Sequence, residues 1–361
     1  MLQNEQEKMS IRGGTSGSGH LTYIDIAKGI GIILMVVGHS SAPKNITHCI
    51  YIFHMPLFFI ISGYLFNFFK WSNNFKGFIN KRFDRMIIPY FGMSILVFYP
   101  MWYIASMKFS QFATHEIPTP QKTFLDIFYA TFVGDGMTFN PVLWFLPCLF
   151  VSEIIFFVLL TLCKTTKMQI LCSISIAIVG YLLRSFNLPW SIDIAMVVQV
   201  LLMSGYLLKK IDIKMWLIAI SMIIFMLSNA FNSVDTSHRI YGNLFLYYAG
   251  GISGTILILK LSDLLDVSMK KTLGKLLAYC GKESMSILMW HGWGLKIATL
   301  LMAILIGKNF LNTKYLLWPM LVIISILFSI TILYVKNKFL KTISKNNNLN
   351  IVKIITKIFA W

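Results

Sequence analysis

Three ionisable residues, Asp25, Lys28 and His39, interrupt the otherwise apolar stretch YIDIAKGIGIILMVVGHS at residues 23–40. Lys28 and His39 are separated by about three turns of an α-helix, so they share one face and lie roughly 16 Å apart along its axis. An imidazole can gain and lose a proton near neutral pH. Asp25 lies one turn before Lys28 and can pair with it. The spacing predicts a stripe with charge at one end and a proton-transfer group at the other.

A second histidine is expected close to the first. His54 lies in the next apolar segment, HCIYIFHMPLFFIISGYLF, and the connection between the two segments is too short to hold them far apart. Pro56 locally breaks the backbone hydrogen bonding, which can aim His54 inward. Two plainer interpretations stay open: Lys28 also fits an interfacial anchor, and His54 also fits a packing histidine.

Two arginines follow the second apolar segment, in KRFDRMIIPY. Arg82 and Arg85 are three residues apart and therefore fall on one helical face. Guanidinium groups bind phosphate through parallel hydrogen bonds, so the pair suits a phosphate-bearing ligand that arrives from the cytoplasm. Membrane topology by itself accounts for Lys70 and Lys76 in the same basic loop.

Three further polar or aromatic residues are candidates for contact with a substrate. Trp144 enters the membrane from the external side, where it fits either an aromatic belt or stacking on a substrate. Glu153 lies further in, where an unpaired carboxylate is costly. His291 follows Lys282 by roughly 13 Å of helix, which places it near the depth of His39. Interior packing accounts for His291 equally well.

The elements that must position these residues are membrane helices. The chain has 361 residues, of which 57% are hydrophobic and 13% charged, with a mean hydropathy of +0.70. This composition is far from that of soluble proteins. We predict an all-α, polytopic integral membrane protein with about ten transmembrane helices and both termini in the cytoplasm. The apolar runs lie near residues 24–43, 47–69, 86–106, 141–162, 168–186, 191–208, 214–231, 240–260, 284–306 and 315–335.

The net charge of +18 would suggest nucleic-acid binding in a soluble chain. In the predicted topology, however, 23 of the 32 lysines and arginines fall on the cytoplasmic side and seven on the other. This distribution follows the positive-inside rule loop after loop. The charge therefore indicates membrane topology, and no nucleic-acid partner is expected.

The chain divides into three predicted parts. Residues 1–20 form a flexible polar tail with the run GGTSGSG, residues 21–336 form the membrane domain, and residues 337–361 form a basic cytoplasmic tail. The five cysteines are odd in number and lack metal-type spacing, so we interpret them as structural and expect no metal site.

The chain resembles the acyltransferase 3 family of integral-membrane acyltransferases, particularly its fucose 4-O-acetylase-like branch, in YIDIAKGIGIILMVVGH, FHMPLFFIISGYLF, KRFDRMIIPY, LWFLPCLF and GKESMSILMWH. These segments span the first to the ninth helix. The resemblance implies a multi-pass enzyme of the bacterial cytoplasmic membrane. It would move an acetyl group from cytoplasmic acetyl-CoA to a hydroxyl of a cell-envelope glycan or lipid-linked sugar.

The family pattern of a basic residue, ten residues and then histidine matches Lys28 and His39, with lysine where other branches have arginine. The imidazole would act as a base for the alcohol or as a nucleophile toward the thioester. We expect catalysis by His39 and His54, and coenzyme A binding by Lys28, Arg82 and Arg85. The residues expected to contact the substrate are Asp25, Trp144, Glu153 and His291.

Two other functions stay open. Intramembrane Lys, His and Glu also build proton relays, so a polysaccharide or solute transporter accounts for the charges, although not for the arginine pair. The second alternative is an acyltransferase that uses another acyl group, such as succinyl. The sequence also leaves open the sugar, the side on which it is presented, the oligomeric state, and the choice between an acyl-histidine and direct transfer.

Overall fold

The structure of the protein is a computed structural model that describes residues 22–109, 119–130, 141–268, 272–307, 313, 315–345 and 357–358. Over these residues the chain is helical, with one isolated β-bridge between Asp235 and Ile240. The tail predicted for residues 1–20 lies outside the described residues.

The α-helices are α2 (Thr22–Gly38), α3 (Lys44–Leu65), α4 (Phe68–Trp71), α5 (Phe75–Arg82), α6 (Ile88–Met93), α7 (Tyr99–Phe109), α8 (Pro120–Tyr129), α9 (Phe145–Leu162), α10 (Thr166–Leu182), α11 (Ile192–Val197), α12 (Gln199–Leu208), α13 (Met215–Phe231), α14 (Leu244–Ser268), α15 (Leu273–Lys282), α16 (Ser284–Ile306) and α18 (Trp318–Lys345). Two π-helical segments, η1 (Phe83–Ile87) and η2 (Ser94–Phe98), and three 3-10 segments, η4 (Pro141–Trp144), η5 (Leu183–Phe186) and η6 (Pro189–Ser191), connect some of them.

The predicted fold class, a polytopic all-α membrane protein, is confirmed. Among the described residues, seven helices are long and apolar enough to cross a membrane, or eight if the pair that bends by 53° between α11 and α12 is one span. The other two predicted spans are the helices α2 and α13, which at 17 residues each are at the lower limit for crossing the hydrocarbon core. The ten predicted segments are thus all helical, but three of them are short or bent. The predicted tail boundary at residue 336 falls inside α18.

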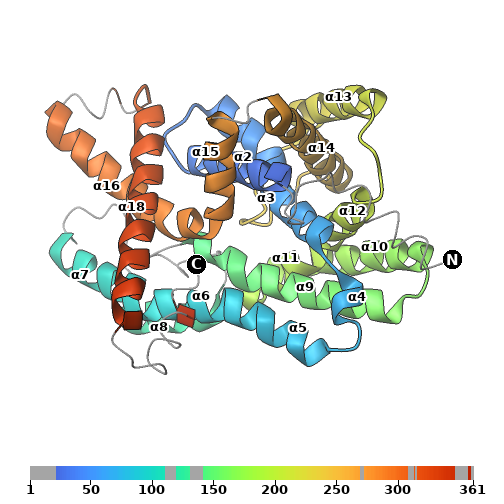
Figure 1. Ribbon diagram of the computed structural model, residues 1–361, viewed down its shortest axis with the longest axis horizontal. Coiled ribbons are helices and arrows are strands. Elements are labelled where there is room, and N and C mark those ends of the chain that lie inside the picture. Colours follow the sequence, from blue (N-terminus) through green and yellow to red (C-terminus); the bar gives the residue numbers. More distant parts are fainter. Residues whose placement is uncertain are drawn as a thin grey trace.

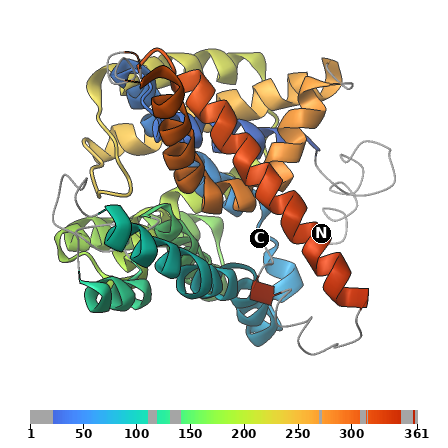
Figure 2. The same cartoon turned by 90° about the vertical axis from the view of Figure 1, so that its left-hand side faces the viewer.

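The helices form two layers, which are seen edge-on in Figure 2. One layer contains α5 and α7 to α11, and the other contains α2, α3 and α13 to α16 (Figure 1). The helix α18 packs on α16 and α2. The first two helices therefore face the long helix α9 across the space between the layers, and the candidate site residues come from both sides of this space.

Glycines bring two pairs of helices to backbone contact. A Cβ at Gly29 of α2 would overlap the carbonyl of Leu277 of α15, and one at Gly281 would overlap the carbonyl of Asp25. Gly63 of α3 and Gly205 of α12 form a similar reciprocal pair. Small residues at such crossings let membrane helices approach closely. The end of α15 is thereby held against the beginning of α2.

A proline shapes the helix that carries the arginines. Pro89 has no N–H to donate to the carbonyl of Arg85, so the regular helical bond is missing there. The chain instead forms the π-helix η1, in which the N–H of Ile88 donates to the carbonyl of Phe83. This wider turn lies directly after Arg82 and includes Arg85, so it sets the direction of both side chains.

A buried ion pair fixes the loop at residues 232–243, between α13 and α14. The guanidinium of Arg239 donates two hydrogen bonds to the carboxylate of Asp193 in α11, at 2.5 and 3.0 Å. The two side chains are 4% and 0% exposed. Such bidentate pairs are strong and geometrically specific. The loop is therefore tied across the two layers.

We predict that Asp193→Ala lowers the midpoint of thermal unfolding in detergent, because removing one partner of a buried ion pair costs about 3–5 kcal/mol. Adding Arg239→Met should restore part of the loss. The matched control is Asp263→Ala, which removes the exposed pair with Lys260 and should cost about 0–1 kcal/mol. Equal shifts for Asp193→Ala and Asp263→Ala would contradict the role of the buried pair.

Candidate active site

Two cavities lie end to end along one face of α2. The face carries Lys28, Ile32, Met35 and His39, at helical spacing. Lys28, Ile32 and Met35 line a larger cavity, and Met35 and His39 line a smaller one. The stripe predicted from the sequence is therefore present, with Lys28 at one end and His39 at the other, about 16 Å away.

The larger cavity, which we call the basic cavity, has a volume of about 310 Å³. Four cationic residues line it: Lys28, Arg82, Arg85 and Lys282. Its other walls are mainly apolar side chains of α2, α3, α9 and α16. The cavity thus combines a cationic region with an apolar surface, as a ligand with phosphate groups and an uncharged arm requires.

Two of these four cations are neutralised inside the protein. The Nζ of Lys28 lies 2.6 Å from the Oδ1 of Asp25. The Nε of Arg82 lies 2.6 Å from the Oε2 of Glu153, whose other oxygen accepts a hydrogen bond of 2.6 Å from the hydroxyl of Ser62. Asp25 and Glu153, which the sequence suggested as substrate contacts, therefore hold cations in place. Asp25 is buried and lines neither cavity.

The other two cations, Arg85 and Lys282, are not paired with an acid among the described residues. Asp84, the acid closest in sequence to Arg85, pairs instead with Lys357 at 2.9 Å. Within the described part of the chain, neither Arg85 nor Lys282 has a carboxylate partner. Both are exposed where they line the basic cavity. This end of the cavity therefore attracts anions.

The smaller cavity, which we call the histidine cavity, has a volume of about 30 Å³. His39 and His54 both line it, as expected from the short connection between α2 and α3, and Trp144 of η4 forms another part of its wall. His39 is exposed, whereas His54 is 5% exposed. The two predicted catalytic residues and the predicted aromatic contact thus meet at one site.

Three histidines share one tautomer. The Nδ1 atoms of His39, His54 and His291 lie 2.8 to 3.0 Å from the backbone carbonyl oxygens of Met35, Ile50 and Ile287, respectively. Because a carbonyl only accepts, the hydrogen-bond geometry assigns the hydrogen to Nδ1 in each ring. In the neutral form each Nε2 then carries a lone pair. His39 and His54 are thereby prepared to accept a proton at the cavity.

His291 lies behind His39 rather than in either cavity. The two ring centroids are 5.3 Å apart in an edge-to-face arrangement, and His291 is fully buried. In the described part of the chain, its Nε2 has no hydrogen-bond partner. His291 thus lies beside His39, but it contacts the ring of His39 and lines neither cavity.

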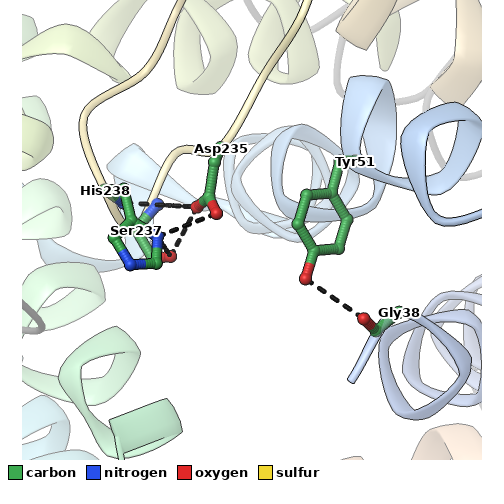
Figure 3. A network of polar contacts seen from close by, with 5 residues as sticks. All are labelled: Gly38, Tyr51, Asp235, Ser237 and His238. Atoms are coloured by element: carbon green, nitrogen blue, oxygen red, sulfur yellow. Dashed lines mark hydrogen bonds and ion pairs between the residues drawn. The ribbon is translucent and has the colours of Figure 1, made fainter. Parts of the chain in front are cut away.

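The loop at residues 232–243 covers the histidine cavity and contributes Asp235, Thr236 and Ser237 to its wall. Figure 3 shows the carboxylate of Asp235 accepting hydrogen bonds from Ser237 and His238 on the same loop. On the other side, the hydroxyl of Tyr51 donates to the carbonyl of Gly38, next to His39, at 3.1 Å. The loop that Arg239 anchors thus places a carboxylate in the wall of the cavity.

Sequence reasoning missed Lys282, Tyr51 and Asp235. Lys282 was assigned only to membrane topology, although it belongs to the segment GKESMSILMWH that supports the family resemblance. Asp235 lies in the polar run NSVDTSHRIYGN between two apolar segments, and this run was its only local signal. The sequence does not predict which cavity these three residues line, because that depends on how the helices pack against one another.

A comparison with protein families shows to which family the chain belongs. A family profile described as an acyltransferase domain, that of acyltransferase 3, matches residues 21–336. The chain belongs to the acyltransferase 3 family. The matched region contains all residues of both cavities in this membrane-bound acyltransferase. Comparisons with curated proteins and with solved structures gave no match.

Proposed function

We propose that this acyltransferase 3 family member transfers an acetyl group from acetyl-CoA to a hydroxyl of a cell-envelope carbohydrate. The observation that carries the proposal is the end-to-end arrangement of a basic cavity and a histidine cavity along α2. Donor and acceptor would enter from opposite ends and meet near His39. The transporter alternative accounts for the polar residues but not for the family match.

The donor fits the basic cavity by charge and polarity. Phosphates of coenzyme A would bind Arg85 and Lys282, which have no carboxylate partner among the described residues. Lys28 and Arg82, whose charges Asp25 and Glu153 balance, would add hydrogen-bond donors at the same wall. The uncharged arm of the donor would follow the apolar wall that ends at Met35. Its thioester would thereby reach the boundary of the histidine cavity.

The reaction needs one group that takes the proton of the alcohol, and His39 supplies it at Nε2. As the hydroxyl oxygen attacks the thioester carbonyl, the new C–O bond forms and the C–S bond breaks. The proton on His39 then passes to the departing sulfur, which leaves as the thiol of coenzyme A. Alternatively, Nε2 of His39 attacks the thioester carbonyl, a C–N bond forms as the C–S bond breaks, and coenzyme A leaves as the thiolate. The sugar hydroxyl then attacks the acetyl-imidazolium, its C–O bond forms as the C–N bond breaks, and its proton passes to the thiolate.

Asp235 adds an electrostatic contribution to this chemistry. Its carboxylate lines the same cavity as His39 and His54. A negative charge close to an imidazole stabilises the protonated ring that forms during proton transfer. We therefore assign Asp235 to the stabilisation of the charge on His39, with Ser237 and His238 holding it.

The setting follows from the family and the charge distribution. We propose a bacterial cytoplasmic membrane location, a cytoplasmic opening for the basic cavity, and membership of the fucose 4-O-acetylase-like branch. The acceptor would be a surface polysaccharide or its lipid-linked precursor. The excess of lysine and arginine in the predicted cytoplasmic loops supports this orientation.

The first test is acetyl transfer by purified protein from radiolabelled acetyl-CoA to a cell-envelope glycan extract. We expect His39→Ala to lower the turnover rate at least about 100-fold, because general bases contribute about 10²–10⁴. The matched control is His48→Ala, which removes a histidine that contacts Asn229 and lines neither cavity. No transfer by the wild type above the His39→Ala background would refute the enzymatic proposal.

The second test measures coenzyme A binding by titration calorimetry in detergent. Arg85→Ala and Lys282→Met should each raise the dissociation constant about tenfold to hundredfold, since a hydrogen bond to a charged group contributes about 1.5–3 kcal/mol. Added salt should reduce the difference in dissociation constant between each variant and the wild type, because it screens the attraction between the cations and the phosphates. Lys76→Met, at an exposed position outside both cavities, is the control. Unchanged affinity in Arg85→Ala and Lys282→Met would remove them from the donor site.

A further inference from the structure

The two cavities are separated by a collar of four apolar residues, Met35, Met55, Phe145 and Leu288. Each of the four lines both cavities, and they come from four different helices: α2, α3, α9 and α16. The basic cavity ends at this collar and the histidine cavity begins there. Any group that passes from a donor in the basic cavity to His39 must therefore pass the collar.

The collar has one rigid side. The ring of Phe145 packs edge-on against Phe59 and Phe58, with centroids 5.4 and 6.0 Å apart. Phe145 and Leu288 are both largely buried. Methionine side chains are more adaptable than these, so Met35 and Met55 can adjust while Phe145 and Leu288 set the width.

Beyond the collar there is room for a small group only. The histidine cavity measures about 30 Å³. One ordered water needs about 10–15 Å³ of such space, so the cavity holds roughly two water-sized groups. That matches the carbonyl and methyl of an acetyl group, whereas a butyryl or succinyl chain exceeds this volume and would have to extend out of the cavity.

The charge of the histidine cavity also disfavours some acyl groups. No lysine or arginine belongs to its described lining, which instead contains the carboxylate of Asp235. A terminal carboxylate on the acyl group would be desolvated at the apolar collar and then repelled by the carboxylate of Asp235. An anionic acyl group is therefore disfavoured by charge as well as by size.

We propose that Met35, Met55, Phe145 and Leu288 form the acyl-selectivity filter of this enzyme, which admits acetyl and excludes longer or anionic acyl groups. This inference rests on the proposed function and narrows its donor class. The sulfur of the thioester lies at the collar and the acyl group beyond it, within reach of His39. Selectivity is then set before the acceptor takes part.

The test compares acetyl-, butyryl- and succinyl-CoA as donors for the envelope glycan extract, with the transferred group identified by mass. For the wild type, kcat/KM should be highest with acetyl-CoA by at least about tenfold, in line with about 1–3 kcal/mol per methylene in an apolar pocket. Comparable values for butyryl- or succinyl-CoA would overturn the filter while leaving acyl transfer intact. No transfer from any of the three would instead refute the proposed function.

Variants that widen the collar provide a second test of the filter. Met55→Ala and Leu288→Ala should each raise the ratio of butyryl to acetyl transfer about tenfold or more. Because the two donors are compared within one variant, a change in affinity for coenzyme A itself cancels in this ratio. If an alanine variant fails to fold, Leu288→Val provides a smaller widening of the same wall. The control is Met222→Ala on α13, a methionine that is 53% exposed on the outer surface. An unchanged ratio in folded collar variants would contradict the proposal.

Discussion

The site depends on the pairing of Glu153 with Arg82. A carboxylate buried in a membrane helix is stable only with a partner, and Arg82 supplies it from α5, in the same layer of helices, at 2.6 Å. This contact ties the end of α5 to α9 and so fixes one wall of the basic cavity. Since Arg82 is thereby compensated, the charge left for a ligand belongs to Arg85 and Lys282.

The two ends of the site differ in their charged residues. Asp25 compensates Lys28 at one end of α2, and Asp235 lies beside the histidines at the other. Between them the four-residue collar carries no charge. An anionic donor is thus attracted to one end, a proton can be accepted at the other, and only a small neutral group fits between. This division suits group transfer better than passage of a whole solute, which would require the collar to open.

Helix periodicity made part of this site predictable. Lys28 and His39 lie on one helix, and so do Arg82 and Arg85, so spacing alone put each pair on one face. The contributions of Lys282 and Asp235 could not be found in this way, because they depend on the glycine contact between α2 and α15 and on the ion pair from Arg239 to Asp193. Hydropathy likewise located ten apolar segments that are all helical, of which seven or eight qualify as spans, but not the 53° bend between α11 and α12.

The central claim is that donor and acceptor use opposite ends of one path, and sidedness tests it most directly. Membrane vesicles that carry the enzyme can be prepared inside-out or right-side-out and supplied with radiolabelled acetyl-CoA, which does not cross the bilayer, outside. We predict that inside-out vesicles incorporate label into glycan in their lumen, that intact right-side-out vesicles do not, and that His39→Ala vesicles give background in both. Equal incorporation by right-side-out vesicles, or label confined to the donor side, would contradict the account.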